Sequence, residues 1–572
     1  MKKLSVLILI LAITTILLPQ ERTIGLMLNN EEKSCEGYIL IAPKHYQHTY
    51  LIDNDGKLIH SWEKCEYEPG QSVYLYDNGD LLRCCFVKGG GLTAGGEGGR
   101  MEMYDWDDNL IWEFDYSTDK YLSHHDVALL PNGNILALVV EYRSKDECIQ
   151  AGFDPEKLDQ QIDKKGMVPD YVAEIKPIFP KGGEIVWEWH VWDHLIQDFD
   201  SSKDNYANPS EHPELIDPNG SGKKVPSFWN HMNSINYNTE LDQVVLSVRG
   251  SSEFWVIDHS TTTEEAKGHT GGKYGKGGDL LYRWGNPSEY GLGTSDDQQL
   301  YQQHDSQWIE SGCPGAGNFL IFNNGLNRPD GSYSSVDEIV SPMDENGFYP
   351  MDEGKAFGPT EILWSYQAEN RFDFFAEAIS GAQRLPNGNT LICDGTHGRL
   401  FEITPEKELV WDYLCPVSNN GIMNQGDEIE LDIRNHQYNA VFKVHRYPSD
   451  FPGFEGKDMT PGEPIEIYPT SVDEQSDMVP NEYKLNQNYP NPFNPITRIS
   501  YQLPSSDNVV IKNYDVVGKE IQVLVNEKKP AGYFDVLWDA TNKFGHQVNS
   551  GIYFYKLQSG NYSVIKKMTL LK

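Results

Sequence analysis

Histidines recur beside short turns at three separated places in the chain, and each is followed by Asp or Asn within two residues. The three segments are "HHDVALLPNGN" (124–134), "WNHMNSINY" (229–237) and "QQHDSQW" (302–308). They contain His125, His231 and His304. An unperturbed imidazole is largely neutral at pH 7, so it has a lone pair for nucleophilic attack or for proton transfer. One such histidine is commonly structural, but three at similar positions indicate a functional cluster.

Two short elements recur through the same region and would position these histidines. One is an apolar-apolar-aromatic-x-aromatic strand, found in "KLIHSW" (57–62), "NLIWEF" (109–114), "EIVWEW" (184–189), "LLYRW" (280–284), "EILWSY" (361–366) and "ELVWDY" (408–413). The other is a hairpin around an Asn-Gly turn, clearest at 127–140 and 382–393. Aromatic residues two apart lie on one face of a strand, and Asn-Gly accepts the positive φ values of a tight hairpin turn.

One hairpin plus one aromatic strand makes an antiparallel unit of roughly 50–95 residues. Six such units predict an all-β fold, a six-bladed β-propeller over residues 36–450. A β-sandwich is the alternative, but it does not explain six copies of one ordered pair. In a propeller the first strand of each blade lines the central channel. The three histidines occupy one equivalent position on the first strand of their hairpins, where other units have Gln71 and Ser380. We therefore expect the three histidines to meet at the axis.

The two ends of the chain differ from the repeats. Residues 1–20 combine Lys2 and Lys3 with a short apolar run, which is typical of a secretory signal peptide. No second apolar stretch is long enough to span a bilayer. A Pro-, Glu- and Asp-rich linker is predicted at 451–484. Alternating strands with Gly and Asn turns then predict a small Ig-like β-sandwich at 485–572.

Composition limits the partners. The formal net charge of −38 argues against nucleic acid or an anionic membrane. An anionic substrate would need a local cluster of Arg and His. Eight scattered cysteines show no pairs at zinc spacing, so we expect neither a metal nor a cofactor. An exported chain can form disulfides, but the sequence does not say which.

The segment "NYPNPFNP" (488–495) opens the C-terminal domain. This region resembles the C-terminal sorting domains of the type IX secretion system. The resemblance implies export through the periplasm to the cell surface or the medium, with the type IX machinery as a partner.

Two segments carry a second resemblance, "FWNHMNSINYNTELDQVVLSVRGSSEFWVID" (228–258) and "GNFLIFNNG" (317–325), together with "QQHDSQW" and two "LPNGN" hairpins. They resemble the bacterial arylsulfotransferase family over roughly 36–450. The most specific element is His-x-Asn with an Arg sixteen residues after the Asn.

The resemblance implies an exported six-bladed propeller that moves a sulfuryl group from an aryl sulfate to a phenol. The route is ping-pong, passes through a sulfated histidine and uses no nucleotide sulfate donor. His304 would be the nucleophile, while His231, Asn233 and Arg249 would bind the sulfuryl oxygens. The remaining family histidine corresponds to His125, although the neighbouring His124 is an alternative. Either His125 or His231 could exchange the phenol proton.

Two other functions remain open at this stage. A non-catalytic surface propeller could bind glycans or polymers through its aromatic loops, and a sulfatase-like hydrolase would use water in place of the phenol.

His397 is interpreted as a turn residue. The glycine-rich segments "GEGGR" (96–100) and "GGKYGKGGD" (271–279) lack a strand–loop–helix context for phosphate and are interpreted as blade insertions. The chain also lacks the N-terminal β-domain and the close cysteine pair of enteric family members, which leaves donor specificity and oligomeric state undecided.

Overall fold

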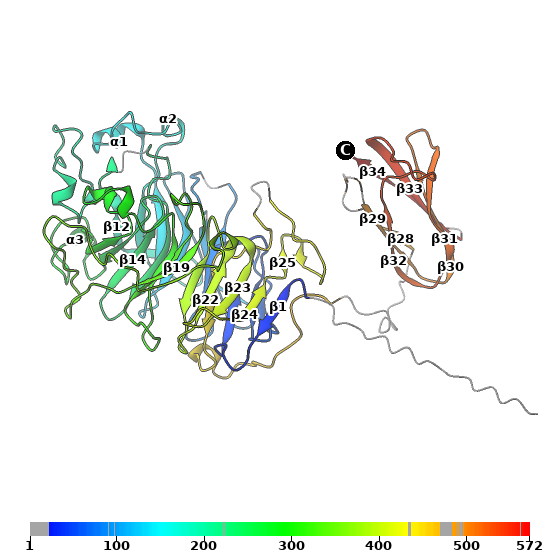
Figure 1. The fold of residues 1–572 in the computed structure, drawn as a ribbon, viewed down its shortest axis with the longest axis horizontal. Coiled ribbons are helices and arrows are strands. Elements are labelled where there is room, and N and C mark those ends of the chain that lie inside the picture. The colour runs from blue at the N-terminus through cyan, green and yellow to red at the C-terminus, as the bar shows by residue number, and fades with distance from the viewer. Residues whose placement is uncertain are drawn as a thin grey trace, which may run out of the picture. The chain divides into compact units, whose positions relative to one another are not determined.

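The computed structural model describes residues 22–468 and 483–571, except residues 90, 97, 221–223, 433–435, 489–490, 492, 494, 496 and 561. The chain divides into two compact units, Met1–Tyr468 and Pro469–Lys572 (Figure 1). The predicted signal peptide at 1–20 lies outside the described residues.

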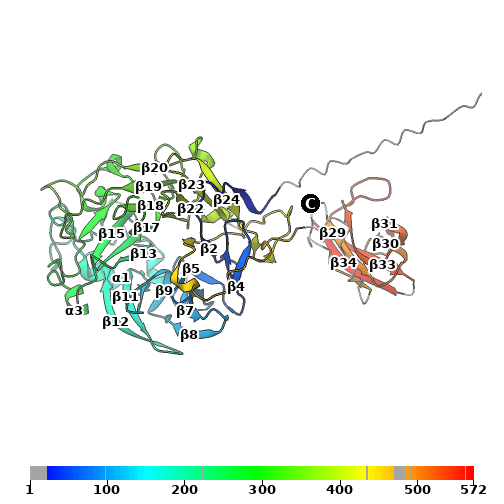
Figure 2. The ribbon, with the colours of Figure 1, turned by 90° about the horizontal axis from the view of Figure 1, so that it is seen from below.

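Six sheets of four or five antiparallel strands build the described part of the first unit, and they follow one another around it (Figure 2). The first sheet contains β27 (His445–Tyr447), β2 (Tyr38–Ile41), β3 (Thr49–Ile52) and β4 (Leu58–Trp62). The second contains β5 (Pro69–Leu75), β6 (Leu81–Phe86), β7 (Gly99–Tyr104) and β8 (Leu110–Asp115). The third contains β9 (Tyr121–Leu129), β10 (Ile135–Glu141), β11 (Asp170–Pro177) and β12 (Gly183–His190).

The remaining three sheets continue the pattern. The fourth contains β13 (Met232–Asn238), β14 (Gln243–Val248), β15 (Glu253–Asp258) and β16 (Tyr282–Trp284). The fifth contains β17 (His304–Trp308), β18 (Phe319–Asn323), β19 (Ser335–Ile339) and β20 (Trp364–Tyr366). The sixth contains β21 (Gly381–Arg384), β22 (Thr390–Asp394), β23 (Arg399–Ile403), β24 (Leu409–Leu414) and the added strand β1 (Gly25–Asn29). A short ribbon, β25 (Val417–Ser418) and β26 (Gly421–Ile422), and the helices α1 (Lys145–Gln150), α2 (Ile162–Lys165) and α3 (Thr263–Ala266) lie in connections.

The six aromatic segments form the fourth strand of each sheet, and their tryptophans explain why the motif recurs. Each donates its indole N–H, at 2.6–3.1 Å, to a backbone carbonyl between the third and fourth strands of the next sheet. The sixth sheet donates back to the first. The donor and acceptor pairs are Trp62–Asp105, Trp112–Gly182, Trp189–Gly278, Trp284–Pro359, Trp364–Pro405 and Trp411–Asn54. The predicted all-β, propeller-like class is confirmed, and the sheets equal in number the predicted repeats.

The first unit extends beyond the predicted limits of 36 and 450. At its start, β1 pairs with β24, so the chain joins the sixth sheet from Gly25. At its end, Phe454 is buried and the Leu58 N–H donates to the Glu463 carbonyl at 3.0 Å. Neither segment carries the aromatic motif, so the pattern gave no signal that they belong to the unit. The described residues 451–468, predicted as linker, are therefore packed on the first unit.

The second unit contains two antiparallel sheets. One has β28 (Lys484–Leu485), β29 (Thr497–Leu503) and β32 (Gly532–Trp538). The other has β31 (Glu520–Lys529), β30 (Asp507–Tyr514), β33 (Gly551–Ser559) and β34 (Tyr562–Leu570). Alternate side chains of both sheets, such as Ile499 and Ile511, share one apolar core. This is the predicted sandwich arrangement.

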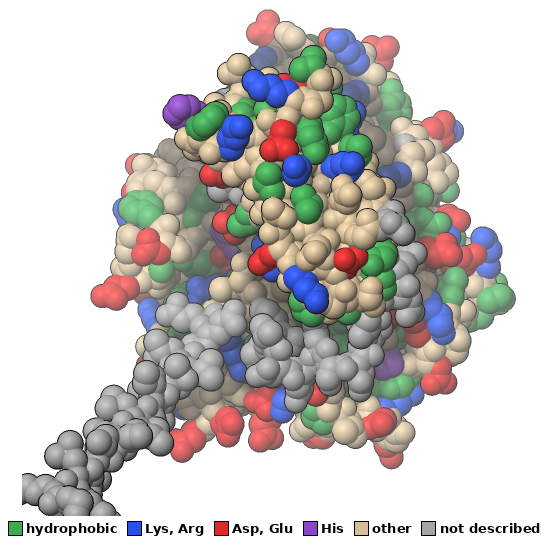
Figure 3. All heavy atoms as spheres, turned by 90° about the vertical axis from the view of Figure 1, so that its right-hand side faces the viewer, with side chains coloured by type: hydrophobic (Ala, Val, Ile, Leu, Met, Phe, Trp, Pro, Cys, Tyr) green, Lys and Arg blue, Asp and Glu red, His purple; other side chains and the backbone are tan. Residues whose placement is uncertain are grey.

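All eight cysteines lie in the described part of the chain, and none forms a disulfide. Among the described residues, no helix has the length and apolarity needed to cross a membrane. On the face drawn in Figure 3, Asp and Glu side chains are scattered among other kinds and form no continuous patch. The negative charge is therefore spread over that face.

Candidate active site

Four of the five predicted site residues line one cavity of about 280 Å³ in the first unit. His125, His231 and His304 come from the first strands of the third, fourth and fifth sheets or from the residue before them, and Arg249 follows β14. These first strands are adjacent, because β13 contacts both β9 and β17. The predicted convergence of the three histidines is what the structure shows.

The backbone at this cavity is unusual. Gln71, His125, His231 and Ser380 have φ values of 109°, 49°, 50° and 86°, which non-glycine residues rarely adopt. At the fifth sheet the left-handed residue is Asp305, one position after His304. Each value costs of order 1–3 kcal/mol, and such conformations cluster at functional sites.

His304 is held in one tautomer by its neighbour Asn324. The Asn324 amide group donates to the carbonyls of Ala376 and Ile379 at 2.8 and 3.0 Å, so its Oδ1 is an acceptor. His304 Nδ1 lies 2.7 Å from that oxygen and must therefore carry the proton. Burial and then the charge of Arg249 lower the pKa of His304 to about 3. The imidazole is thus neutral at pH 7, with its lone pair on Nε2.

His124 lies next to His125, and the tautomer of His124 decides which nitrogen of His125 is protonated. His124 Nε2 is 2.9 Å from Oδ1 of the buried Asp170, and the two Nδ1 atoms of His124 and His125 are 2.8 Å apart. If His124 donates from Nε2 to the carboxylate, its Nδ1 accepts from Nδ1–H of His125. His125 then keeps an unprotonated Nε2. His125 lines the cavity and His124 does not, which separates the two residues that the sequence left undecided.

His231 completes the histidine cluster. Its ring stacks on Phe228 at 4.2 Å between centroids and lies 5.2 Å from the ring of His125. Burial, followed by the positive charge of Arg249, holds its pKa well below the usual value. Burial also holds the pKa of His125 well below the usual value. The three imidazoles are therefore neutral and add no positive charge of their own near pH 7.

Arg249 supplies the permanent charge of the cavity. Burial lowers its pKa, yet an arginine stays protonated near neutral pH. Among the residues that the structure describes, no side chain hydrogen-bonds to its guanidinium or forms an ion pair with it. A partly buried cation with unused N–H donors is suited to a tetrahedral or planar anion.

Asn233 is placed beside the cavity rather than in it. Its side chain is fully buried and donates from Nδ2 to the carbonyl of Gln303 at 2.8 Å. Gln303 directly precedes His304, so Asn233 fixes the strand that presents the nucleophile candidate. The predicted contact between Asn233 and sulfuryl oxygens stays a prediction.

Sequence reasoning missed part of the lining. Gly95 and Gly96 of the glycine-rich loop border the cavity, and a Cβ on Gly96 would lie 2.1 Å from His125 Nε2. Lys44, His45 and His436 also line it. The motif "GEGGR" was the available signal, because its first glycine, Gly96, permits close approach to His125. His397 is outside the lining and bonds to Asp394 at 2.8 Å, as expected of a turn residue.

A buried ion cluster lies next to these histidines in the chain. Lys443 Nζ is 2.7 Å from Asp126 Oδ2 and 3.1 Å from Asp305 Oδ1. Burial lowers the pKa of Lys443, but the two carboxylates outweigh it and hold that pKa well above its usual value. Since Asp126 follows His125 and Asp305 follows His304, the cluster ties two histidine-bearing strands to the segment that enters β27.

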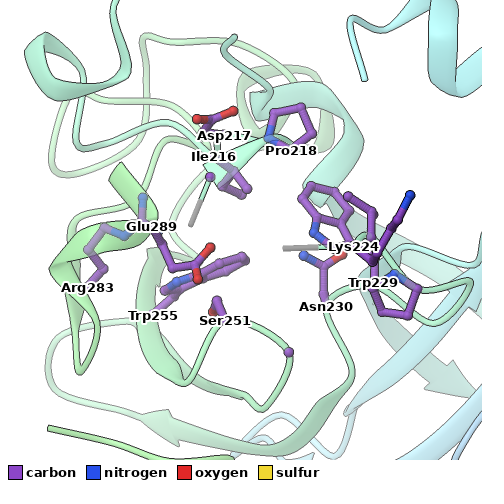
Figure 4. A pocket seen from close by; sticks show the side chains of 14 residues that line it. Ile216, Asp217, Pro218, Lys224, Trp229, Asn230, Ser251, Trp255, Arg283 and Glu289 are labelled. Atoms are coloured by element: carbon purple, nitrogen blue, oxygen red, sulfur yellow. The ribbon is translucent and has the colours of Figure 1, made fainter. Parts of the chain in front are cut away.

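A second, smaller cavity of about 80 Å³ lies in the same unit and contains none of the predicted residues. Figure 4 shows Trp229 and Asn230 on one side of it and Trp255 and Glu289 on the other. Burial raises the pKa of its Asp217 to about 6. It lacks a cluster of neutral imidazoles, so the histidine cavity is the candidate active site.

The fold and the site define a β-propeller-like protein with a histidine-lined cavity that can accept an anion. The chain belongs to the arylsulfotransferase family, since the family model described as "Arylsulfotransferase (ASST)" matches residues 25–442. A second match, described as "Secretion system C-terminal sorting domain", covers residues 487–570. Membership supports aryl sulfotransferase activity in general, and the sorting domain indicates export to the cell surface or the medium.

The solved structures that match the chain share little sequence with it. A protein of unknown function from Bacteroides caccae is 12% identical, with 66% of this chain and 94% of that chain covered and a TM-score of 0.34. A streptogramin B lyase is 8% identical, with coverage of 75% and 95% and a TM-score of 0.32. PorZ, a surface component of the type IX secretion system of Porphyromonas gingivalis, is 10% identical, with coverage of 92% and 74% and a TM-score of 0.21. No curated protein matches the chain.

Proposed function

We propose that the cavity transfers a sulfuryl group from an aryl sulfate to a phenolic acceptor through a covalent intermediate on Nε2 of His304. One observation carries this proposal. The hydrogen bond from His304 to Asn324 leaves a lone pair on Nε2 in a cavity that also holds the guanidinium of Arg249, which has no side-chain partner among the described residues. Such a pairing of nucleophile and cation suits a substrate that is both electrophilic and anionic.

In the first half-reaction, the Nε2 lone pair attacks sulfur, an N–S bond forms, and the bond from sulfur to the aryl oxygen breaks. The aryl oxide leaves with the electron pair. The ring then carries the sulfuryl group on Nε2 and a proton on Nδ1, so it is positively charged. The side-chain oxygen Oδ1 of Asn324 accepts the hydrogen bond from Nδ1–H and stabilises the charged ring. Arg249 offsets the negative charge on the sulfuryl oxygens.

In the second half-reaction, an acceptor phenol loses its proton and its oxygen attacks sulfur, which breaks the N–S bond and returns the neutral imidazole. His125 is the base best placed for this step, because it lines the cavity and, if His124 donates from Nε2 to Asp170, its own Nε2 is unprotonated. His231 is the alternative proton carrier. The donor and the acceptor would occupy the same cavity in turn, which is a ping-pong scheme.

The test uses 4-nitrophenyl sulfate with and without phenol. We expect the full chain to release nitrophenolate and form phenyl sulfate, and His304→Ala to lose both activities. His397→Ala is the matched control, since His397 lies outside the cavity lining and should keep activity. Equal turnover by His304→Ala would contradict the proposal.

Two further measurements distinguish the alternatives. Release of sulfate at an undiminished rate without phenol would indicate a hydrolase, and no turnover by the wild-type protein would favour a binding propeller. Quenching the enzyme with donor alone and mapping the modified peptide should place one sulfuryl group on His304.

A further inference from the structure

A second cluster of side chains lies away from the histidine cavity. It contains His194, from the 3₁₀ helix η1 (Val191–His194) after β12, and His269 and Asp279, from the connection between β15 and β16. His194 Nδ1 is 3.0 Å from Asp279 Oδ1, and His269 Nδ1 is 2.8 Å from the same oxygen. The three donor atoms all lie within 4.8 Å of one another.

His194 cannot satisfy Asp279 as a neutral imidazole. Its Nε2 lies 2.8 Å from the backbone carbonyl of Ala266, which only accepts, so Nε2 carries the proton. The remaining nitrogen, Nδ1, then has a lone pair and faces Oδ1 of Asp279, which also has only lone pairs. Two lone pairs at this distance repel each other. The side chain of His194 is fully buried and its ring stacks on Trp189, which fixes this orientation. Either a proton or a cation has to lie between Nδ1 and Oδ1.

The arrangement matches a divalent metal site. A histidine that donates its second N–H to a backbone carbonyl is the usual arrangement of a metal-bound imidazole. Zinc ligands at about 2.0–2.1 Å in a tetrahedron stand roughly 3.3 Å apart, slightly more than the 2.8 and 3.0 Å separations here. The His269 side chain is 61% exposed, so it can hold its proton on Nε2 toward solvent and present Nδ1 to the metal.

We propose that Nδ1 of His194, Nδ1 of His269 and Oδ1 of Asp279 bind one Zn²⁺, with water as the fourth ligand. The site would be structural. It joins the end of the third sheet to an insertion of the fourth, beside the hydrogen bond from Trp189 to the carbonyl of Gly278. Two nitrogen ligands and one carboxylate favour zinc over magnesium or calcium, which prefer oxygen ligands.

The test compares Zn²⁺ uptake by the full-length chain after removal of metal with a chelator. The chain has other histidines that could take up Zn²⁺, so the readout is the difference in Zn²⁺ stoichiometry between wild type and His269→Ala. We expect the variant to bind one equivalent fewer, and Zn²⁺ to raise the melting temperature of wild type by more than that of His269→Ala. His269 is largely exposed, so its loss should leave the fold intact.

His212→Ala is the matched control, because His212 is a partly exposed histidine paired with Glu214 at 3.1 Å and lies outside the cluster. It should bind as many equivalents as wild type. Co²⁺ provides a second readout, since a tetrahedral absorption band should be equally strong in wild type and in His212→Ala and weaker in His269→Ala. Equal Zn²⁺ stoichiometry in wild type and His269→Ala would overturn the proposal.

Discussion

His304 donates its Nδ1–H to Oδ1 of Asn324 at 2.7 Å, and two backbone carbonyls fix the amide of Asn324 in turn. This relationship decides which nitrogen of His304 is free to react. The nucleophile candidate is therefore defined by a residue twenty positions away that makes no contribution to the cavity lining.

Replacing Asn324 with Leu should lower kcat by about 10²–10⁴-fold, the range expected when a catalytic imidazole loses its defined tautomer. KM for 4-nitrophenyl sulfate should change little, because Asn324 does not line the cavity. Steady-state kinetics with excess phenol give both constants. A variant that loses only affinity would show that Asn324 does not act through His304.

Stability should depend on pH through the buried imidazole of His304. Its pKa is about 3 in the folded protein against 6.5 in an unfolded chain, so the unfolded state takes up protons first on acidification. The stabilising contribution is complete above pH 6.5 and is lost as the pH falls toward 3. We expect the free energy of unfolding to fall less steeply over pH 6.5–4 in His304→Gln than in wild type. Identical slopes in urea titrations would contradict this.

Arg249 should matter for charge and for geometry. Arg249→Met removes the cation that faces the substrate sulfuryl group and should lower kcat/KM by about 10²–10³-fold. Arg249→Lys keeps the charge but loses the forked N–H donors, so it should recover only part of the rate. Full activity in Arg249→Met would exclude a role in binding the anion.

Two glycines of one loop form a matched pair. Gly96 (φ +65°) and Gly89 (φ +93°) both adopt backbone conformations that cost an alanine about 1–2 kcal/mol. A Cβ on Gly96 would lie 2.1 Å from His125 Nε2, whereas a Cβ on Gly89 meets nothing within 4 Å. Gly96→Ala should therefore abolish turnover and Gly89→Ala should not. Equal activities would show that the loop does not shape the site.

The ion cluster at Lys443 should be important for stability. Lys443→Met leaves Asp126 and Asp305 as uncompensated buried carboxylates, which should cost about 3–5 kcal/mol in unfolding free energy. Lys355→Met, which removes an exposed ion pair with Asp352, should be close to wild type. Urea unfolding measures both. A Lys443→Met protein as stable as wild type would show that the cluster is replaceable.

Much of the fold was predictable from its repeats. The six aromatic segments identify the outer strands because a tryptophan that hydrogen-bonds to the next sheet leaves a regular pattern. Strand β1 and residues 451–468 were not predictable, since their positions depend on pairing with distant segments and not on local pattern.

The site was predictable in part for the same reason. His125, His231, His304 and Arg249 share a cavity, as the repeat register and the family resemblance indicated. The role of Asn324, the position of Asn233 behind the cavity and the meeting of His194 with Asp279 depend on side-chain contacts across loops. The spacing of residues along the chain does not predict these contacts.

The pairing of β27 with β2 also sets an order of events for the newly made chain. Tyr38 pairs with Tyr447, so the ring can close only when nearly the whole first unit has been synthesised. Lys443 lies just before β27, so its ion pairs with Asp126 and Asp305 can form only then. The carboxylates that follow His125 and His304 therefore gain their buried cation only after most of the first unit has been made.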